Sequence, residues 1–199
     1  MKRITLIIIA LAASITSFAQ SNDEIMAKLT QAAASMKSMQ CNFTQNKTMS
    51  MLAEPTTSKG RMCYVAPDKM KWEYTDPYPF AINVDGEKMT KIADGKEEIL
   101  DTKNRMYQGM MKIIMSSATG KNLFDKSAFD VTISDDGNFW RADMKPKKSD
   151  MKRMFSTMTF YFEKKRDIIN KVVLTEANGD NTTIQFTDII LNANTESCK

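Results

Sequence analysis

The chain has 199 residues, with 28 lysines and arginines, 24 aspartates and glutamates, and no histidine. This length suits one domain with a substantial core, and the near-balanced charge argues against a nucleic-acid-binding protein. The lack of histidine excludes Ser-His-Asp and Cys-His catalytic systems and histidine-based zinc sites. The carboxylates show no recognisable acid–base pairing either, so we expect no enzyme, no cofactor and no bound metal.

The N-terminus has the features of a secretory signal peptide. Lys2 and Arg3 form a basic start, residues 4–15 are uncharged and mostly apolar, and Ser17 and Ala19 are the small residues that a cleavage site requires. The apolar run is too short for a membrane span. We therefore expect residues 1–19 to be removed and residues 20–199 to form one exported, soluble domain.

After this segment, the periodicity predicts one helix and then short antiparallel strands. Ser21 and Glu24 have capping-box spacing, and apolar residues recur at positions 25, 29, 32 and 36. From Met39 onward the period changes to two. Strands separated by turns rich in proline and glycine are predicted at residues 39–44, 58–65, 70–74, 80–84 and 88–93.

Residues 105–117 return to helical spacing and carry an unusually wide apolar face. A single charge, Lys112, lies in the middle of this segment, so we expect a methionine-rich helix that covers the sheet rather than an ordinary surface helix. No helices alternate with the strands, which disfavours a parallel sheet. Further strands are predicted at residues 130–134, 138–143, 154–162, 168–176 and 181–191.

A single antiparallel sheet of this size must cover its apolar face, and two helices provide little cover. We therefore expect a mainly β (α+β) domain in which one curved antiparallel sheet forms an incomplete barrel with the helices over its opening. Sixteen of the seventeen methionines follow position 19. Methionine suits an adaptable apolar pocket, although it also fills ordinary cores, and a Cu(I) thioether site at Met49 and Met51 is a third interpretation.

Three cysteines, Cys41, Cys63 and Cys198, permit one disulfide at most. Strand alternation places Cys41 and Cys63 on opposite faces of the sheet, which argues against a bridge between them. A bridge to Cys198 stays open.

Several short segments occur in a recognisable order along the chain. They are Phe43-Thr44-Gln45, Gly60-Arg61-Met62, the stretch at residues 67–77 that contains Met70-Lys71-Trp72, and Val84-Asp85-Gly86. A weaker continuation covers residues 145–147 and 179–184. Together they resemble the periplasmic outer-membrane lipoprotein carriers of the LolA type.

The resemblance implies an unclosed barrel of about eleven strands with a helical lid. It also implies a periplasmic carrier that shields the acyl chains of lipoproteins or phospholipids between an inner-membrane lipoprotein-releasing transporter and an outer-membrane acceptor. Many family members close the lid with an arginine before the strand-ending proline, but here Ala66 precedes Pro67. The expected ligand contacts are Phe43, Met62, Tyr64, Met70, Trp72, Phe80, Ile82 and Val84 in the sheet, and Met106, Met110, Ile113 and Ile114 in the lid helix.

Alternatives remain open for each of these assignments. Every expected contact would also serve as ordinary core packing. A lipid-sensing regulator of the same fold, which binds a membrane partner instead of transporting cargo, is the alternative function, although such sensors usually add a second domain. The basic loop at residues 145–148 is either solvated or docks on an acidic partner or anionic headgroups. We expect a monomer that binds no nucleic acid.

Overall fold

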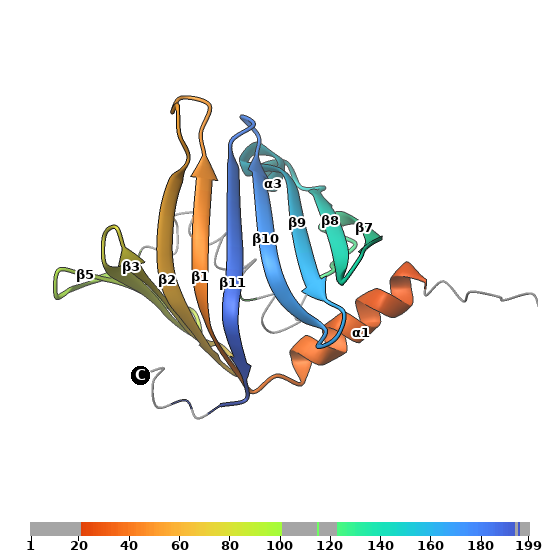
Figure 1. The fold of residues 1–199 in the computed structure, drawn as a ribbon, viewed down its shortest axis with the longest axis horizontal. Coiled ribbons are helices and arrows are strands. Elements are labelled where there is room, and N and C mark those ends of the chain that lie inside the picture. Colours follow the sequence, from red (N-terminus) through yellow and green to blue (C-terminus); the bar gives the residue numbers. More distant parts are fainter. Residues whose placement is uncertain (1–20, 101–114, 116–122, 194, 196–199) are drawn as a thin grey trace, which may run out of the picture.

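A computed structural model describes residues 21–100, 115, 123–193 and 195. Figure 1 shows one curved sheet with a helix at its lower end. The sheet has eleven strands, and the described residues also form two helices, α1 (Asn22–Ala34) and α3 (Ser149–Met154). Neither of these helices has the length and hydropathy that a bilayer span requires.

The strands form two antiparallel meanders that meet where β1 pairs with β11. The free edges, β6 and β7, do not pair, so the sheet is not closed into a barrel. This confirms the predicted mainly β fold with a single unclosed sheet. The first meander consists of β1 (Ser38–Thr48), β2 (Thr56–Val65), β3 (Lys69–Asp76), β4 (Phe80–Asp85), β5 (Lys88–Ala93) and β6 (Lys96–Ile99), and the second of β7 (Phe129–Asp136), β8 (Phe139–Pro146), β9 (Phe155–Glu163), β10 (Ile168–Glu176) and β11 (Asn181–Leu191).

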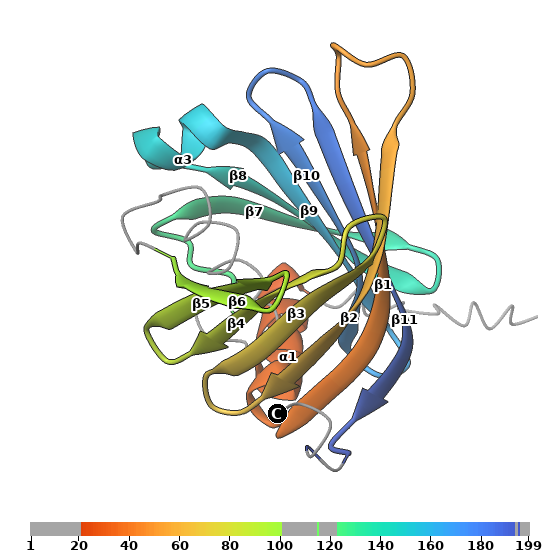
Figure 2. The same cartoon turned by 90° about the vertical axis from the view of Figure 1, so that its left-hand side faces the viewer.

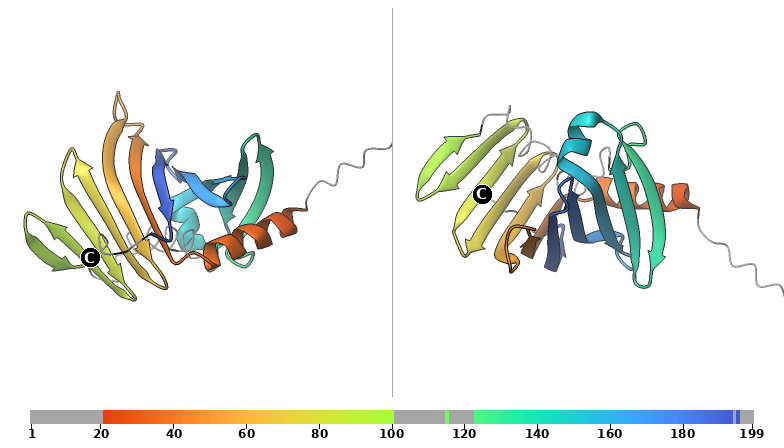
Figure 3. Two further views of the ribbon diagram at one scale, coloured as in Figure 1. Left: turned by 60° about the horizontal axis from the view of Figure 1, so that its bottom comes forward. Right: turned by 90° about the horizontal axis from the view of Figure 1, so that it is seen from above.

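Helix α1 begins at the capping box that the sequence predicts, with reciprocal hydrogen bonds between Ser21 and Glu24. Its apolar stripe, which includes Ile25 and Leu29, is buried in the core. The helix runs across the open side of the curved sheet (Figures 2 and 3), and an ion pair of 2.9 Å joins Lys28 to Asp167 in the turn between β9 and β10. One end of the concave face is therefore covered by α1.

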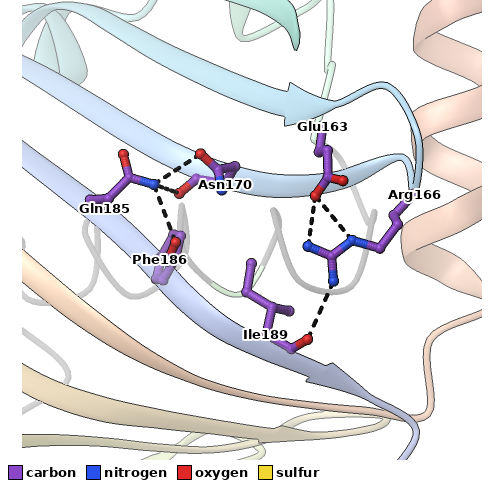
Figure 4. Close-up of polar contacts among 6 residues, drawn as sticks. All are labelled: Glu163, Arg166, Asn170, Gln185, Phe186 and Ile189. Carbon is purple, nitrogen blue, oxygen red and sulfur yellow. Dashed lines mark hydrogen bonds and ion pairs between the residues drawn. The ribbon is translucent and has the colours of Figure 1, made fainter. Parts of the chain in front are cut away.

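The convex face of the second meander is held by polar side chains (Figure 4). Arg166, in the turn between β9 and β10, donates to the carboxylate of Glu163 from Nη2 at 2.6 Å and from Nε at 3.0 Å. Its Nη1 also donates to the carbonyl oxygen of Ile189 in β11 at 3.3 Å. The Gln185 amide donates to both the backbone and the side-chain oxygen of Asn170. These contacts tie β9, β10 and β11 together.

Two elements were not predicted from the sequence. β6 has four exposed residues and hence no alternation that reveals it, and its Lys and Glu side chains suit an unpaired sheet edge. The basic loop continues into the short helix α3, so Met154 ends a helix and β9 begins at Phe155. Ala66 is exposed beyond the end of β2, where its amide donates to the carbonyl oxygen of Lys37.

Some predictions concern residues outside the described part of the chain. The proposed signal peptide is one, and the lid contacts Met106, Met110, Ile113 and Ile114 are another. Met115 is the one described residue of the expected helix at 105–117; it is helical and packs against the core.

The two cysteines of β1 and β2 lie on opposite faces of the sheet, as strand alternation predicts. Cys63 is disulfide-bonded and Cys41 is a free, buried thiol, so the two do not bridge each other.

Candidate functional site

The eight expected sheet contacts lie on one face of the first meander. Residues that pair across neighbouring antiparallel strands share a face. Trp72 in β3 lies opposite Met62 in β2 and Ile82 in β4. The other pairs on this face are Phe43 with Gly60, Tyr64 with Met70, Met70 with Val84, and Tyr74 with Phe80.

An aromatic cluster occupies the centre of this face. The Phe43 and Trp72 rings stack with their centroids 4.2 Å apart, and Tyr74 and Phe80 stack at 4.4 Å. Trp72 is only 1% exposed. The centre of the face is therefore packed core in this structure, and ligand contact at the eight positions stays a prediction.

The Trp72 indole N–H is buried and has no hydrogen-bond partner in the described part of the chain. Leaving a buried donor without a partner costs about 1–3 kcal/mol. An acceptor group that reached the cluster would remove this cost by accepting a hydrogen bond from the indole N–H. The methionines beside it, Met62 and Met70, have flexible side chains that adapt to changes in shape.

A cavity of about 440 Å³ opens at one end of the sheet. This volume lies in the range of about 300–1,000 Å³ that is typical of small-molecule sites. Its walls come from β1, β3, β10, β11, α3 and the start of β9. The residues that line it are Gln45, Lys47, Tyr74, Arg153, Met154, Phe155, Leu174, Glu176, Ala177, Asn178 and Thr182.

The cavity has an apolar interior and a charged mouth. Tyr74, Phe155 and Leu174 are buried side chains of its wall. At the mouth, the Lys47 ammonium and the Glu176 carboxylate form an ion pair of 3.0 Å, and Arg153 is exposed. This arrangement suits an amphipathic ligand with an apolar chain inside and a polar end at the rim.

The sequence predictions did not identify this cavity. None of the described residues that line it belongs to the expected contacts. Tyr74 shares the face of Trp72, and Met154 begins a predicted strand, so the sequence offered a partial indication of these two residues. Leu174 and Thr182 pair with each other on β10 and β11, and alternation along one strand does not bring them beside β3.

The buried Cys41 is poorly suited to nucleophilic chemistry. Burial raises the pKa of its thiol to about 12, so the thiol is protonated at neutral pH. It lies in β1 on the apolar face, next to Met62 in β2.

Solved structures share this fold. The Pseudomonas aeruginosa MucA/MucB complex matches with 13% identity and a TM-score of 0.54 over 88% of this chain and 59% of that chain. A crystal structure of MucB matches with 12% identity and a TM-score of 0.57 over 88% and 61%, respectively. A LolA superfamily protein from Nitrosomonas europaea, NE2245, matches with 8% identity and a TM-score of 0.47 over 90% and 97%. This chain thus spans less than two thirds of the MucB chains.

No curated protein matches the chain in a sequence comparison. The family described as "Outer membrane lipoprotein carrier protein LolA" matches residues 34–197, which cover α1's last residue, every strand of the sheet and α3. The protein therefore belongs to the LolA family.

Proposed function

We propose that this protein is a periplasmic carrier that holds the acyl chains of a lipoprotein or lipid on its concave face while the cargo moves from the inner to the outer membrane. The observation that carries the proposal is the apolar cavity with a charged mouth between β1, β3, β10 and α3. Membership of the lipoprotein carrier family supports it. By the same resemblance, its partners are an inner-membrane releasing transporter and an outer-membrane acceptor, and it acts by binding without catalysis.

The physical need for such a carrier is large. Each methylene group exposed to water costs about 0.8 kcal/mol, so one long acyl chain costs on the order of 10 kcal/mol. A carrier must shield the chain and later release it, which favours a pliable apolar wall over a tightly fitted one. The cavity places Met154 beside rigid aromatic residues, and the neighbouring cluster contains Met62 and Met70.

The cavity and the aromatic cluster are continuous along β3. Tyr74 lines the cavity and also contacts Phe43 at 5.3 Å between ring centroids. We propose that an acyl chain enters at the rim and advances toward Trp72 by displacing methionine side chains. The expected sheet contacts, and the lid contacts Met106, Met110, Ile113 and Ile114, would then line the longer path.

A cavity-filling variant tests this function. Met154→Trp with Leu174→Trp adds bulk to the wall and should reduce binding of a fluorescent fatty acid by at least about tenfold, because the chain loses the space that shields it. The measurement is a fluorescence titration of protein beginning at Gln20. Mass spectrometry of lipids extracted from the purified protein gives a second readout.

The control places tryptophan at Ile190, which is exposed and lies outside the residues that line this cavity. Ile190→Trp should bind the probe as the unchanged protein does. If the cavity-filled variant folds and binds equally well, the cavity is not the acyl site. If even the unchanged protein binds no lipid, the carrier function itself is wrong.

A second candidate is a lipid-sensing regulator. The fold-level likeness to MucB, which is solved in complex with MucA, favours it. Transfer of a bound lipoprotein to acceptor membranes separates the two, because a regulator would bind lipid without delivering it.

A further inference from the structure

The hairpin between β1 and β2 ends in two neighbouring exposed apolar residues. Met51 is 93% exposed and Leu52 is 47% exposed. A hydrogen bond from the Leu52 amide to the Met49 carbonyl, 3.0 Å long, shapes the turn. This tip projects beyond the sheet (Figures 1 and 2). Its apolar side chains are therefore accessible to a binding partner or a surface at this end of the molecule.

Hydrogen bonds place this tip on the same rim as the cavity mouth. The amide and hydroxyl groups of Ser50 donate to the Asp180 carboxylate at 2.9 and 3.1 Å, which joins the hairpin to the β10–β11 turn. The amide of Ala177 in that turn donates to the carbonyl oxygen of Met154, the last residue of α3. The tip, the β10–β11 turn and α3 therefore lie at one end of the sheet (Figure 1), where α3 and the β10–β11 turn also line the cavity.

The same rim carries positive charge. Lys148, Lys152 and Arg153 lie at or in α3, all three are exposed, and within the described residues none forms an ion pair. The acidic side of the rim is partly neutralised, because Glu176 pairs with Lys47. Two exposed apolar residues and unpaired cations at the same end of the sheet are suited to a surface that is both apolar and anionic.

We infer that this rim docks on an anionic lipid bilayer, with Met51 and Leu52 entering the membrane interface and Lys148, Lys152 and Arg153 contacting the headgroups. In this orientation the cavity mouth faces the membrane, so an acyl chain can pass between the two without crossing water. The inference goes beyond the proposed function, because it concerns where the protein meets a membrane and does not depend on the cargo.

Vesicle sedimentation tests the docking surface. Protein beginning at Gln20 should bind vesicles of phosphatidylcholine mixed with phosphatidylglycerol and bind phosphatidylcholine vesicles far less. Met51→Ser with Leu52→Ser removes the apolar tip, and Lys148→Glu with Lys152→Glu reverses the charge. Each pair should lower the bound fraction at limiting lipid by about tenfold or more.

Matched controls change the same chemistry elsewhere. Ile99→Ser removes an apolar side chain that is 69% exposed on the edge strand β6. Lys37→Glu with Lys165→Glu makes the same charge change at the opposite end of the sheet. Lys37 precedes β1, and Lys165 lies in the β9–β10 turn. Both controls should bind anionic vesicles as the unchanged protein does. If they lose binding as much as the rim variants, the binding is nonspecific and the inference is wrong.

A probe at the tip reports entry into the bilayer directly. Leu52→Cys labelled with an environment-sensitive dye should brighten and shift to shorter wavelength on anionic vesicles, and the buried Cys41 should not take the label. An unchanged spectrum would overturn the inference and leave the tip as a contact for a protein. If the protein binds vesicles but no fatty acid, the docking surface stands and the carrier function is wrong. If it binds fatty acid but no vesicles, only the docking surface is wrong.

Discussion

Gly60 in β2 shows how one residue sets the packing of the concave face. It lies opposite Phe43 in β1 and next to an irregularity in the β2–β3 pairing. A methyl group built on Gly60 would collide with the carbonyl oxygen of Glu73 and with the Phe43 ring. The absence of a side chain therefore lets the Phe43 ring lie across the strand and reach Trp72.

We expect Gly60→Ala to destabilise the protein by about 1–3 kcal/mol, because overpacking forces side chains and backbone to move. Urea unfolding followed by tryptophan fluorescence measures this loss. Ser58→Ala, two residues earlier in β2, is the control and should have little effect. Equal stability of Gly60→Ala and the unchanged protein would show that the strand can shift at no cost.

At the scale of elements, the two long hairpins are joined by Asp180. Its carboxylate accepts hydrogen bonds from Ser50 and from the Asn178 side chain. The backbone N–H of Ser50, more than the Asn178 amide, holds the pKa of the Asp180 carboxyl below its ordinary range. The ionised group is therefore the one that fixes the β1–β2 hairpin to the β10–β11 turn.

This contact makes the rim sensitive to acid. A lowered pKa in the folded state contributes stability above the unfolded pKa of about 3.9, and this contribution disappears as the pH falls through the folded value. Asp180→Asn should reproduce the loss at neutral pH, because the amide carries no charge. Hydrogen exchange at the Ser50 amide should be several-fold faster in this variant, whereas Asp188→Asn, on the convex face, should leave it unchanged.

At the scale of the whole molecule, the pairing of β1 with β11 joins the two meanders into one sheet. Both strands have neighbours on each side, and they carry buried residues such as Phe43 and Phe186. β6 lies at a free edge and all four of its residues are exposed. The stability of the sheet is therefore expected to fall from its centre toward that edge.

Hydrogen exchange detected by mass spectrometry should show this gradient, with the slowest exchange in β1 and β11 and the fastest strand exchange in β6. A central strand opens only when two ladders break, whereas an edge strand opens when one does. Exchange in β6 as slow as in β1 would mean that another part of the chain covers this edge.

Local patterns in the sequence were sufficient for much of this description. The cap formed by Ser21 and Glu24, the alternation that places Met62, Met70 and Trp72 together, and the separation of Cys41 from Cys63 all follow from the helical and strand periods. The family also followed from short ordered segments along the chain. β6 and α3 were missed because their exposed or charged residues have no apolar period.

The cavity and the rim were decided only by the tertiary structure. Alternation shows which face a side chain occupies, but it does not show which strands become neighbours or where their side chains leave space. Tyr74, Leu174 and Met154 line one cavity because β1 pairs with β11 and α3 joins the β10–β11 turn. The β1–β11 pairing joins segments more than a hundred residues apart, so the cavity depends on the curvature and order of the whole sheet.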